Sequence, residues 1–153
     1  MGLGRTTRFA PLPAGARRIS VMRRGAAALA VLAPSESLLA DFLAKKRALV
    51  AAGRGPDAAH AEACRLIDYR ARFRREIRSR RAAMAALRRL VREAATRDLY
   101  LMCMCPYRTR ESACHTYLLL ELARELDPTV TLLPEPAPRS RRRSAITPAA
   151  NTR

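Results

Sequence analysis

Residues 99–126 read LYLMCMCPYRTRESACHTYLLLELAREL, and this stretch decides the fold class. Leu99–Met104 is a continuous apolar run of strand length, which is typical of a strand buried within a sheet. After an irregular loop, leucines recur at helical spacing, which predicts a helix over Ser112–Leu126. Asp127-Pro128 ends that helix, and Thr129–Leu133 is expected to form another strand. A strand–helix–strand unit of this kind favours parallel pairing.

Upstream, the pattern predicts one more strand and three helices. Ile19–Met22 alternates like a short strand. Ser35 is expected to be the N-cap of a helix that Gly53 ends. Asp57 is expected to cap the next helical region, which runs to about residue 95 and breaks between two helices at residues 78–81.

These elements predict a single α/β domain over residues 17–133, with a small, mainly parallel sheet flanked by helices. Residues 1–16 are expected to be an extended lead-in, because they are rich in glycine, proline and arginine. Residues 134–153 are expected to be a disordered basic tail. At 153 residues the chain is long enough to bury a core without a disulfide or metal.

The net charge of +17 is compatible with nonspecific binding to nucleic acid. All the basic side chains except Lys45 and Lys46 are arginines, accompanied by many alanines, and this composition also arises without any binding role. The arginines between residues 70 and 81 are expected to lie mostly on an outward helix face. No apolar run is long enough to cross a membrane.

Three of the four cysteines lie within twelve residues, which indicates a site in a reduced, cytoplasmic protein rather than a disulfide scaffold. Cys103 and Cys105 follow the predicted strand, whereas Cys114 and His115 open the predicted helix. Ligands collect at the carboxyl ends of parallel strands, and helix N-termini favour thiolates and anions. We therefore expect these four side chains to share one edge of the sheet.

Three uses of this cluster remain open. Cys103, Cys105, Cys114 and His115 could bind zinc or iron, although cysteines separated by one residue are unusual zinc ligands. Alternatively, Cys114 or Cys105 acts as a nucleophile with His115 as base, and Cys105 is the expected partner because adjacent helical residues diverge. The third reading is a set of small core residues, with His115 bonded to a backbone carbonyl. Cys64 and His60 are expected to be a core residue and an exposed residue, respectively.

The stretch from Leu99 to His115 resembles the signature of the domain-of-unknown-function family 488, in which an apolar strand ends in Cys and a Cys-His-Arg sequence opens a helix. Residues 32–35 (Leu-Ala-Pro-Ser) and the segment around Tyr69 and Phe73 are also similar to that family. Thr116 stands where the family has arginine. The Cys-x-Cys-Pro sequence before Cys-His also resembles domain of unknown function 4326.

The resemblance implies a compact α/β fold with a Cys/His site, and it implies no activity. Our leading hypothesis is a small-ligand-binding or enzymatic domain with its site at the strand end and helix N-terminus. Arg108 and Arg110 of the loop are the expected contacts for a small anionic ligand. The alternative is a protein that binds nucleic acid through its arginine face and basic tail.

Overall fold

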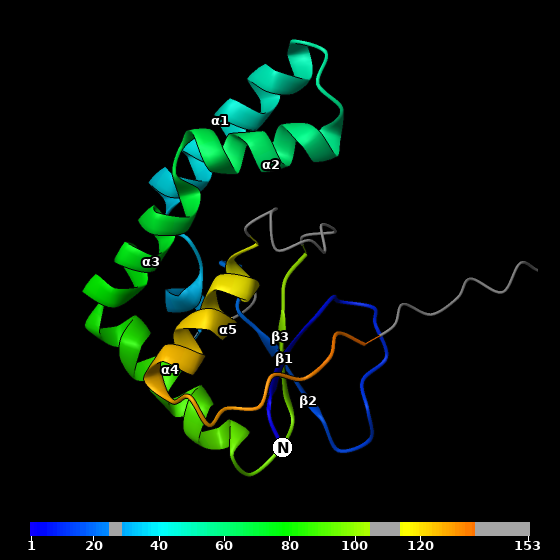
Figure 1. The fold of residues 1–153 in the computed structure, drawn as a ribbon, viewed down its shortest axis with the longest axis vertical. Helices are drawn as coiled ribbons and strands as arrows, with labels where there is room; N and C mark the ends of the chain where they lie inside the picture. Colours follow the sequence, from blue (N-terminus) through cyan, green and yellow to red (C-terminus); the bar gives the residue numbers. More distant parts are fainter. Residues whose placement is uncertain (25–28, 105–113, 137–153) are drawn as a thin grey trace, which may run out of the picture.

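The protein is described by a computed structural model that covers residues 1–24, 29–104 and 114–136. Three parallel strands form the sheet in the order β1-β3-β2 (Figure 1). The strands are β1 (Leu3–Thr6), β2 (Arg17–Ser20) and β3 (Leu99–Met102). Leu99 is in register with Leu3 on one side and with Arg17 on the other. The predicted α/β class with a small parallel sheet is therefore confirmed.

The expectation that residues 1–16 form an extended lead-in is wrong for β1, which is a full member of the sheet. The sequence did not predict this strand because Gly2 precedes it and Gly4 lies within it, and glycine is depleted in strands. Gly4 permits close packing on the face of the sheet away from the core. A Cβ atom there would lie 2.8 Å from the ring of Tyr100 and 3.0 Å from Leu133.

The predicted strand over Thr129–Leu133 is reduced to one bridge beside β1, between Leu3 and Leu132. Hydrogen bonds from Leu3 N to Thr131 O (2.9 Å) and from Leu133 N to Leu3 O (3.0 Å) hold this segment. Pro134 has no backbone N–H, so the ladder cannot continue through it. Strand β2 begins at Arg17, two residues before the predicted start at Ile19.

Among the described residues, a short 3-10 helix, η1, and four α-helices lie between β2 and β3, and one more helix follows β3. Their bounds are η1 (Ala30–Leu32), α1 (Glu36–Ala51), α2 (Pro56–Leu66), α3 (Tyr69–Ser79), α4 (Arg81–Ala94) and α5 (His115–Leu126). The predicted break near residue 80 is confirmed. A second break was missed at Asp68, which has a left-handed backbone (φ 52°) that aspartate tolerates better than most residues. Helix α2 begins at Pro56 with Gly55 as its N-cap, whereas the sequence predicted Asp57 as the cap.

The core lies between one face of the sheet and the helices, where Leu99 and Leu101 of β3 meet the apolar faces of α4 and α5. α1 and α2 form an arm that projects beyond the sheet, and α3 leads from it back to the core (Figure 1). No helix within the described ranges is long and apolar enough to cross a membrane.

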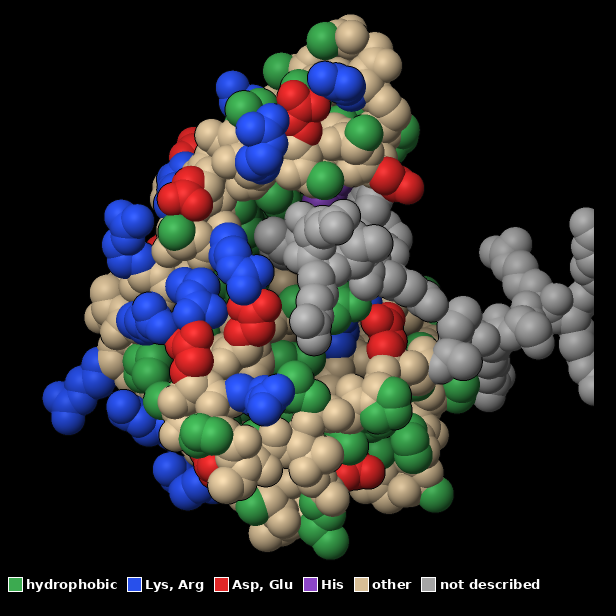
Figure 2. All heavy atoms as spheres, viewed as in Figure 1, with side chains coloured by type: hydrophobic (Ala, Val, Ile, Leu, Met, Phe, Trp, Pro, Cys, Tyr) green, Lys and Arg blue, Asp and Glu red, His purple; other side chains and the backbone are tan. Residues whose placement is uncertain are grey.

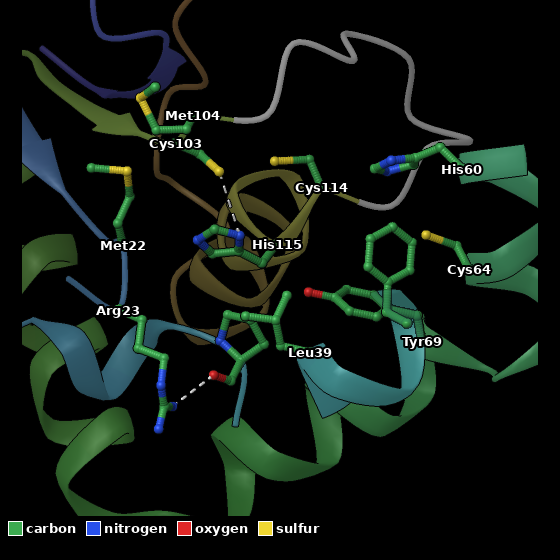
Figure 3. A pocket seen from close by; sticks show the side chains of 12 residues that line it. Met22, Arg23, Leu39, His60, Cys64, Tyr69, Cys103, Met104, Cys114 and His115 are labelled. Carbon is green, nitrogen blue, oxygen red and sulfur yellow. Dashed lines mark hydrogen bonds between the residues drawn. The ribbon is translucent and has the colours of Figure 1, made fainter. Parts of the chain in front are cut away.

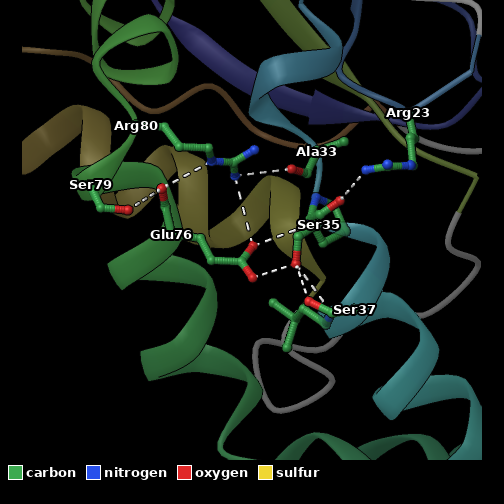
Figure 4. Close-up of polar contacts among 9 residues, drawn as sticks. Arg23, Ala33, Ser35, Ser37, Glu76, Ser79 and Arg80 are labelled. Carbon is green, nitrogen blue, oxygen red and sulfur yellow. Dashed lines mark hydrogen bonds and ion pairs between the residues drawn. The ribbon is translucent and has the colours of Figure 1, made fainter.

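A polar network fixes the base of the arm (Figure 4). The Ser35 hydroxyl oxygen accepts a hydrogen bond from Leu38 N (3.1 Å), as the sequence predicts for an N-cap. Ser35 also donates from its backbone N to Glu76 Oε2 (3.0 Å) and from its hydroxyl to the other carboxylate oxygen. Arg80 then connects the end of α3 to the Ala33 carbonyl (3.2 Å). The start of α1 is thereby fixed against α3.

Replacing Ser35 with alanine is expected to destabilise the protein by about 1–2 kcal/mol, because the helix loses its cap and Glu76 loses a partner. Urea unfolding followed by circular dichroism measures this change. Ser37→Ala is the comparison variant, because it removes the exposed Ser35–Ser37 hydroxyl contact but keeps the helix cap and both bonds to Glu76. Equal free energies of unfolding for the two variants would show that the network does not hold the arm.

Candidate functional site

The carboxyl end of β3 and the N-terminus of α5 bring Cys103, Cys114 and His115 together. Their two sulfur atoms and one ring nitrogen all lie within 4.8 Å of one another. Cys103 follows the central strand directly, and Cys114 is the N-cap of α5. All three side chains are buried. The predicted convergence at this edge of the sheet is therefore present for these three residues.

His115 is held in one orientation. Its Nε2 lies 3.1 Å from the carbonyl oxygen of Val21, and because a carbonyl only accepts, Nε2 carries the proton. The ring also packs edge-on against Phe73, with centroids 5.9 Å apart. The other nitrogen, Nδ1, faces Cys103 Sγ at 3.7 Å and can accept the thiol proton. The backbone-carbonyl contact expected of a core histidine thus coexists with a thiol–imidazole pair.

Cys114 belongs to a second set of contacts that begins at a buried arginine. Arg5, 1% exposed on β1, donates from Nε to Thr116 Oγ1 (3.1 Å) and from Nη1 to Glu135 (2.7 Å). Thr116 Oγ1 lies 3.1 Å from Cys114 Sγ, so its hydroxyl can donate to a thiolate there. Burial acts to lower the pKa of Arg5, but its electrostatic interactions with Cys114 and Glu135 outweigh this effect and raise that pKa. This arrangement favours negative charge at Cys114.

The cluster opens onto a cavity of about 190 Å³ between the arm and the end of the sheet (Figure 3). Cys103, Cys114 and His115 lie together on one side of it, whereas Tyr69, His60 and Cys64 lie on another. Apolar groups predominate among the remaining lining residues, which are Met22, Arg23, Pro34, Leu39, Phe42 and Met104.

Buried side chains from α1, α2 and α3 form the wall opposite His115. The expectation that His60 is exposed is wrong: it is 6% exposed and packs edge-on against Phe42, with centroids 4.8 Å apart. Its helix packs onto α1, and that tertiary contact is invisible in the local pattern. Burial is the main cause that raises the pKa of Cys64 to about 11, and burial likewise raises the pKa of Tyr69. Both groups are therefore neutral at physiological pH.

The predicted site residues have different outcomes. The thiol that contacts His115 is Cys103, which we expected only as a metal ligand. Cys105, Arg108 and Arg110 lie outside the described residues, so their predicted roles stay predictions. Sequence reasoning missed Arg5, whose isolated position in a glycine-rich segment gives no motif.

The arginines of α3 are largely engaged with acidic side chains, and basic and acidic groups alternate over one face of the molecule (Figure 2). The hydrogen bond from Arg74 is the main cause that lowers the pKa of Glu125. Most of these pairs join α3 to α5. The pairs are Arg70–Glu121, Arg74–Glu121, Arg74–Glu125, Arg78–Glu125 and Arg72–Asp41. The predicted outward arginine face is therefore in part an inter-helix ion-pair network.

A comparison with protein families identifies the family of this chain. The model of DUF488-N3a, described as the active DUF488-N3 subclade, matches residues 13–126. The matched range includes Cys103, Cys114 and His115, and it begins after Arg5. No curated protein and no solved structure matches the chain. Because the match covers most of the sequence, the protein belongs to the DUF488 family, within its DUF488-N3a subclade.

Proposed function

We propose that this protein is an enzyme that acts on a small molecule through Cys103, Cys114 and His115. The observation that carries the proposal is the contact between Cys103 Sγ and His115 Nδ1, with Nε2 anchored on the Val21 carbonyl. A nucleophile, a base and a group that orients the base are the three parts of an activated thiol. The cavity beside them supplies space for a substrate. The word "active" in the family description also supports an activity.

The chemistry follows from the protonation states. His115 Nδ1 takes the proton of the Cys103 thiol, and the resulting thiolate attacks an electrophilic atom of the substrate. A new bond to sulfur forms as a bond of the substrate breaks, and the protonated imidazole returns the proton to the leaving group. Cys114, beside Thr116 and Arg5, supplies a second thiol in the same site.

A metal centre is the second candidate, because the three potential ligand atoms lie within 4.8 Å of one another. A histidine that ligates through one nitrogen usually donates the other N–H to a carbonyl, as His115 does to Val21. Zinc or iron on Cys103, Cys114 and His115 would supply a Lewis acid at the cavity. Cys105 is a candidate fourth ligand from the sequence alone.

Nucleic-acid binding through the arginine face has less support. Four arginines of α3 share three carboxylates in five ion pairs, so most of their charge is compensated locally. Nonspecific binding through the tail, and a small anionic ligand bound by Arg108 and Arg110, are alternative proposals, and binding of a carboxylate such as benzoate would favour the second. We also propose a cytoplasmic location, because four cysteines in 153 residues are too few for a disulfide scaffold of the secreted kind.

Cys103 is expected to react with iodoacetamide much faster than Cys64 at pH 8. With a pKa near 11, about one Cys64 side chain in a thousand is a thiolate at pH 8. The alkylation rate of Cys64 should therefore rise roughly tenfold per pH unit below pH 10. Peptide-resolved mass spectrometry measures each rate. His115→Gln is expected to slow Cys103 by about tenfold or more and to leave Cys64 unchanged, because only Cys103 loses its base. Equal slowing at both positions would contradict a specific thiol–imidazole pair.

Thr116→Val is expected to slow alkylation of Cys114 by about tenfold, since a hydrogen bond to a charged acceptor is worth about 1.5 kcal/mol or more. The same valine should leave Cys103 largely unaffected. Thr129→Val on the exposed surface serves as the matched control. An unchanged Cys114 rate would show that the Arg5–Thr116 contacts do not act on this thiol.

Metal analysis separates the two candidate chemistries. Protein purified under reducing conditions is expected to contain less than about 0.1 equivalent of zinc or iron if the thiols act directly. One equivalent that disappears in Cys114→Ala would instead establish the metal centre. Leu43→Ala, an exposed position on α1, controls for nonspecific loss.

A further inference from the structure

We infer that the substrate carries a single uncharged aromatic ring, which lies in the half of the cavity formed by α1, α2 and α3. The inference rests on the proposed function, because it assigns the substrate class of the same site. The cavity has two chemically different halves. The sheet end presents Cys103, Cys114 and His115, and the opposite end presents His60 and Tyr69 (Figure 3). Phe42 also lines the cavity and packs against both of these rings.

The three rings form a structured wall. Phe42 packs edge-on against His60 at 4.8 Å and against Tyr69 at 5.7 Å, with interplanar angles of 69° and 63°. Each ring is less than 9% exposed, so the wall is fixed by packing on its other sides. Edge-to-face arrangements of this kind are the ones that a further ring extends favourably. Sulfur atoms of Met22 and Met104 line the same cavity, and thioethers also contact aromatic rings favourably.

The cavity volume limits the ligand to one ring. A closed apolar cavity of about 150 Å³ is known to accept benzene. The volume here, about 190 Å³, leaves room for one ring and a short substituent. Such a substituent would extend from the aromatic wall toward Cys103 and His115, where the proposed attack takes place.

The lining also argues against a charged ring. Among the described residues that line the cavity, Arg23 alone carries a permanent charge. Its guanidinium is bound to the Pro34 carbonyl (3.2 Å) and paired with Glu36 (2.7 Å). Tyr69 is held as the neutral phenol by its burial. Among the described lining residues, a carboxylate or ammonium group on the ring would therefore find no compensating partner for the hydration that it loses.

The test uses the whole wild-type chain and three probes in saturation-transfer NMR: benzyl alcohol, cyclohexylmethanol and benzoate. Benzyl alcohol is expected to bind about two- to tenfold more tightly than cyclohexylmethanol, although the cyclohexyl ring is more hydrophobic. Benzoate is expected to show no binding at the same concentration. Saturating benzyl alcohol should also slow alkylation of Cys103 by at least about threefold. Equal or tighter binding of cyclohexylmethanol or benzoate would overturn the inference.

A pair of tryptophan variants locates the binding. Leu39→Trp fills the cavity from α1 and is expected to abolish benzyl alcohol binding, whereas Leu43→Trp on the exposed side of the same helix should not. Retained binding in Leu39→Trp would place the ring elsewhere and overturn the inference. A fast-reacting Cys103 without selective binding of benzyl alcohol would overturn the inference about the ring and leave the proposed function standing. Selective binding of benzyl alcohol to a protein with unreactive thiols would instead overturn the proposed function.

Discussion

The site depends on the parallel pairing of β3 with a strand on each side. Because parallel strands end at the same edge of a sheet, the residues that follow β2 and β3 meet there without any further constraint. Val21 then lies one residue beyond β2 and Cys103 one beyond β3. α5 enters at the same edge and places His115 between them. Sheet register thus sets the distances within the thiol–imidazole pair.

The two sides of the cavity come from different parts of the fold. Cys103, Cys114 and His115 come from the end of β3 and the start of α5, whereas the opposite wall of the cavity comes from α1, α2 and α3. Ser35, Glu76 and Arg80 fix the start of α1 against the end of α3. α1 and α2 pack chiefly on each other, whereas α3 also packs on α4 and α5. Phe73 of α3 contacts the ring of His115, so α3 connects the wall to the Cys/His end of the cavity.

Local chemistry made much of this structure predictable. The apolar run that begins at Leu99 predicts β3, and Ser35 predicts the start of α1; the structure confirms both. It also confirms that Cys103, Cys114 and His115 come together at the end of β3. Other features depend on contacts between distant parts of the chain. β1 is a strand because it pairs with β3, His60 is buried because α2 packs on α1, and Arg5 reaches Thr116 across 111 positions. No pattern within a short window reports such contacts.

The pairing of Arg5 with Glu135 joins residues separated by 130 positions, and it also bears on when the site forms during synthesis. The central strand β3 emerges from the ribosome long after β1 and β2, so neither early strand has a partner until residues 99–102 appear. Helices α1 to α4 can form in that interval, since their contacts are local. The cavity wall therefore precedes Cys103, Cys114 and His115 on the nascent chain. Arg5 meets Thr116, which lies beside Cys114, only once α5 has docked, so the buried cation joins this end of the cavity late in folding.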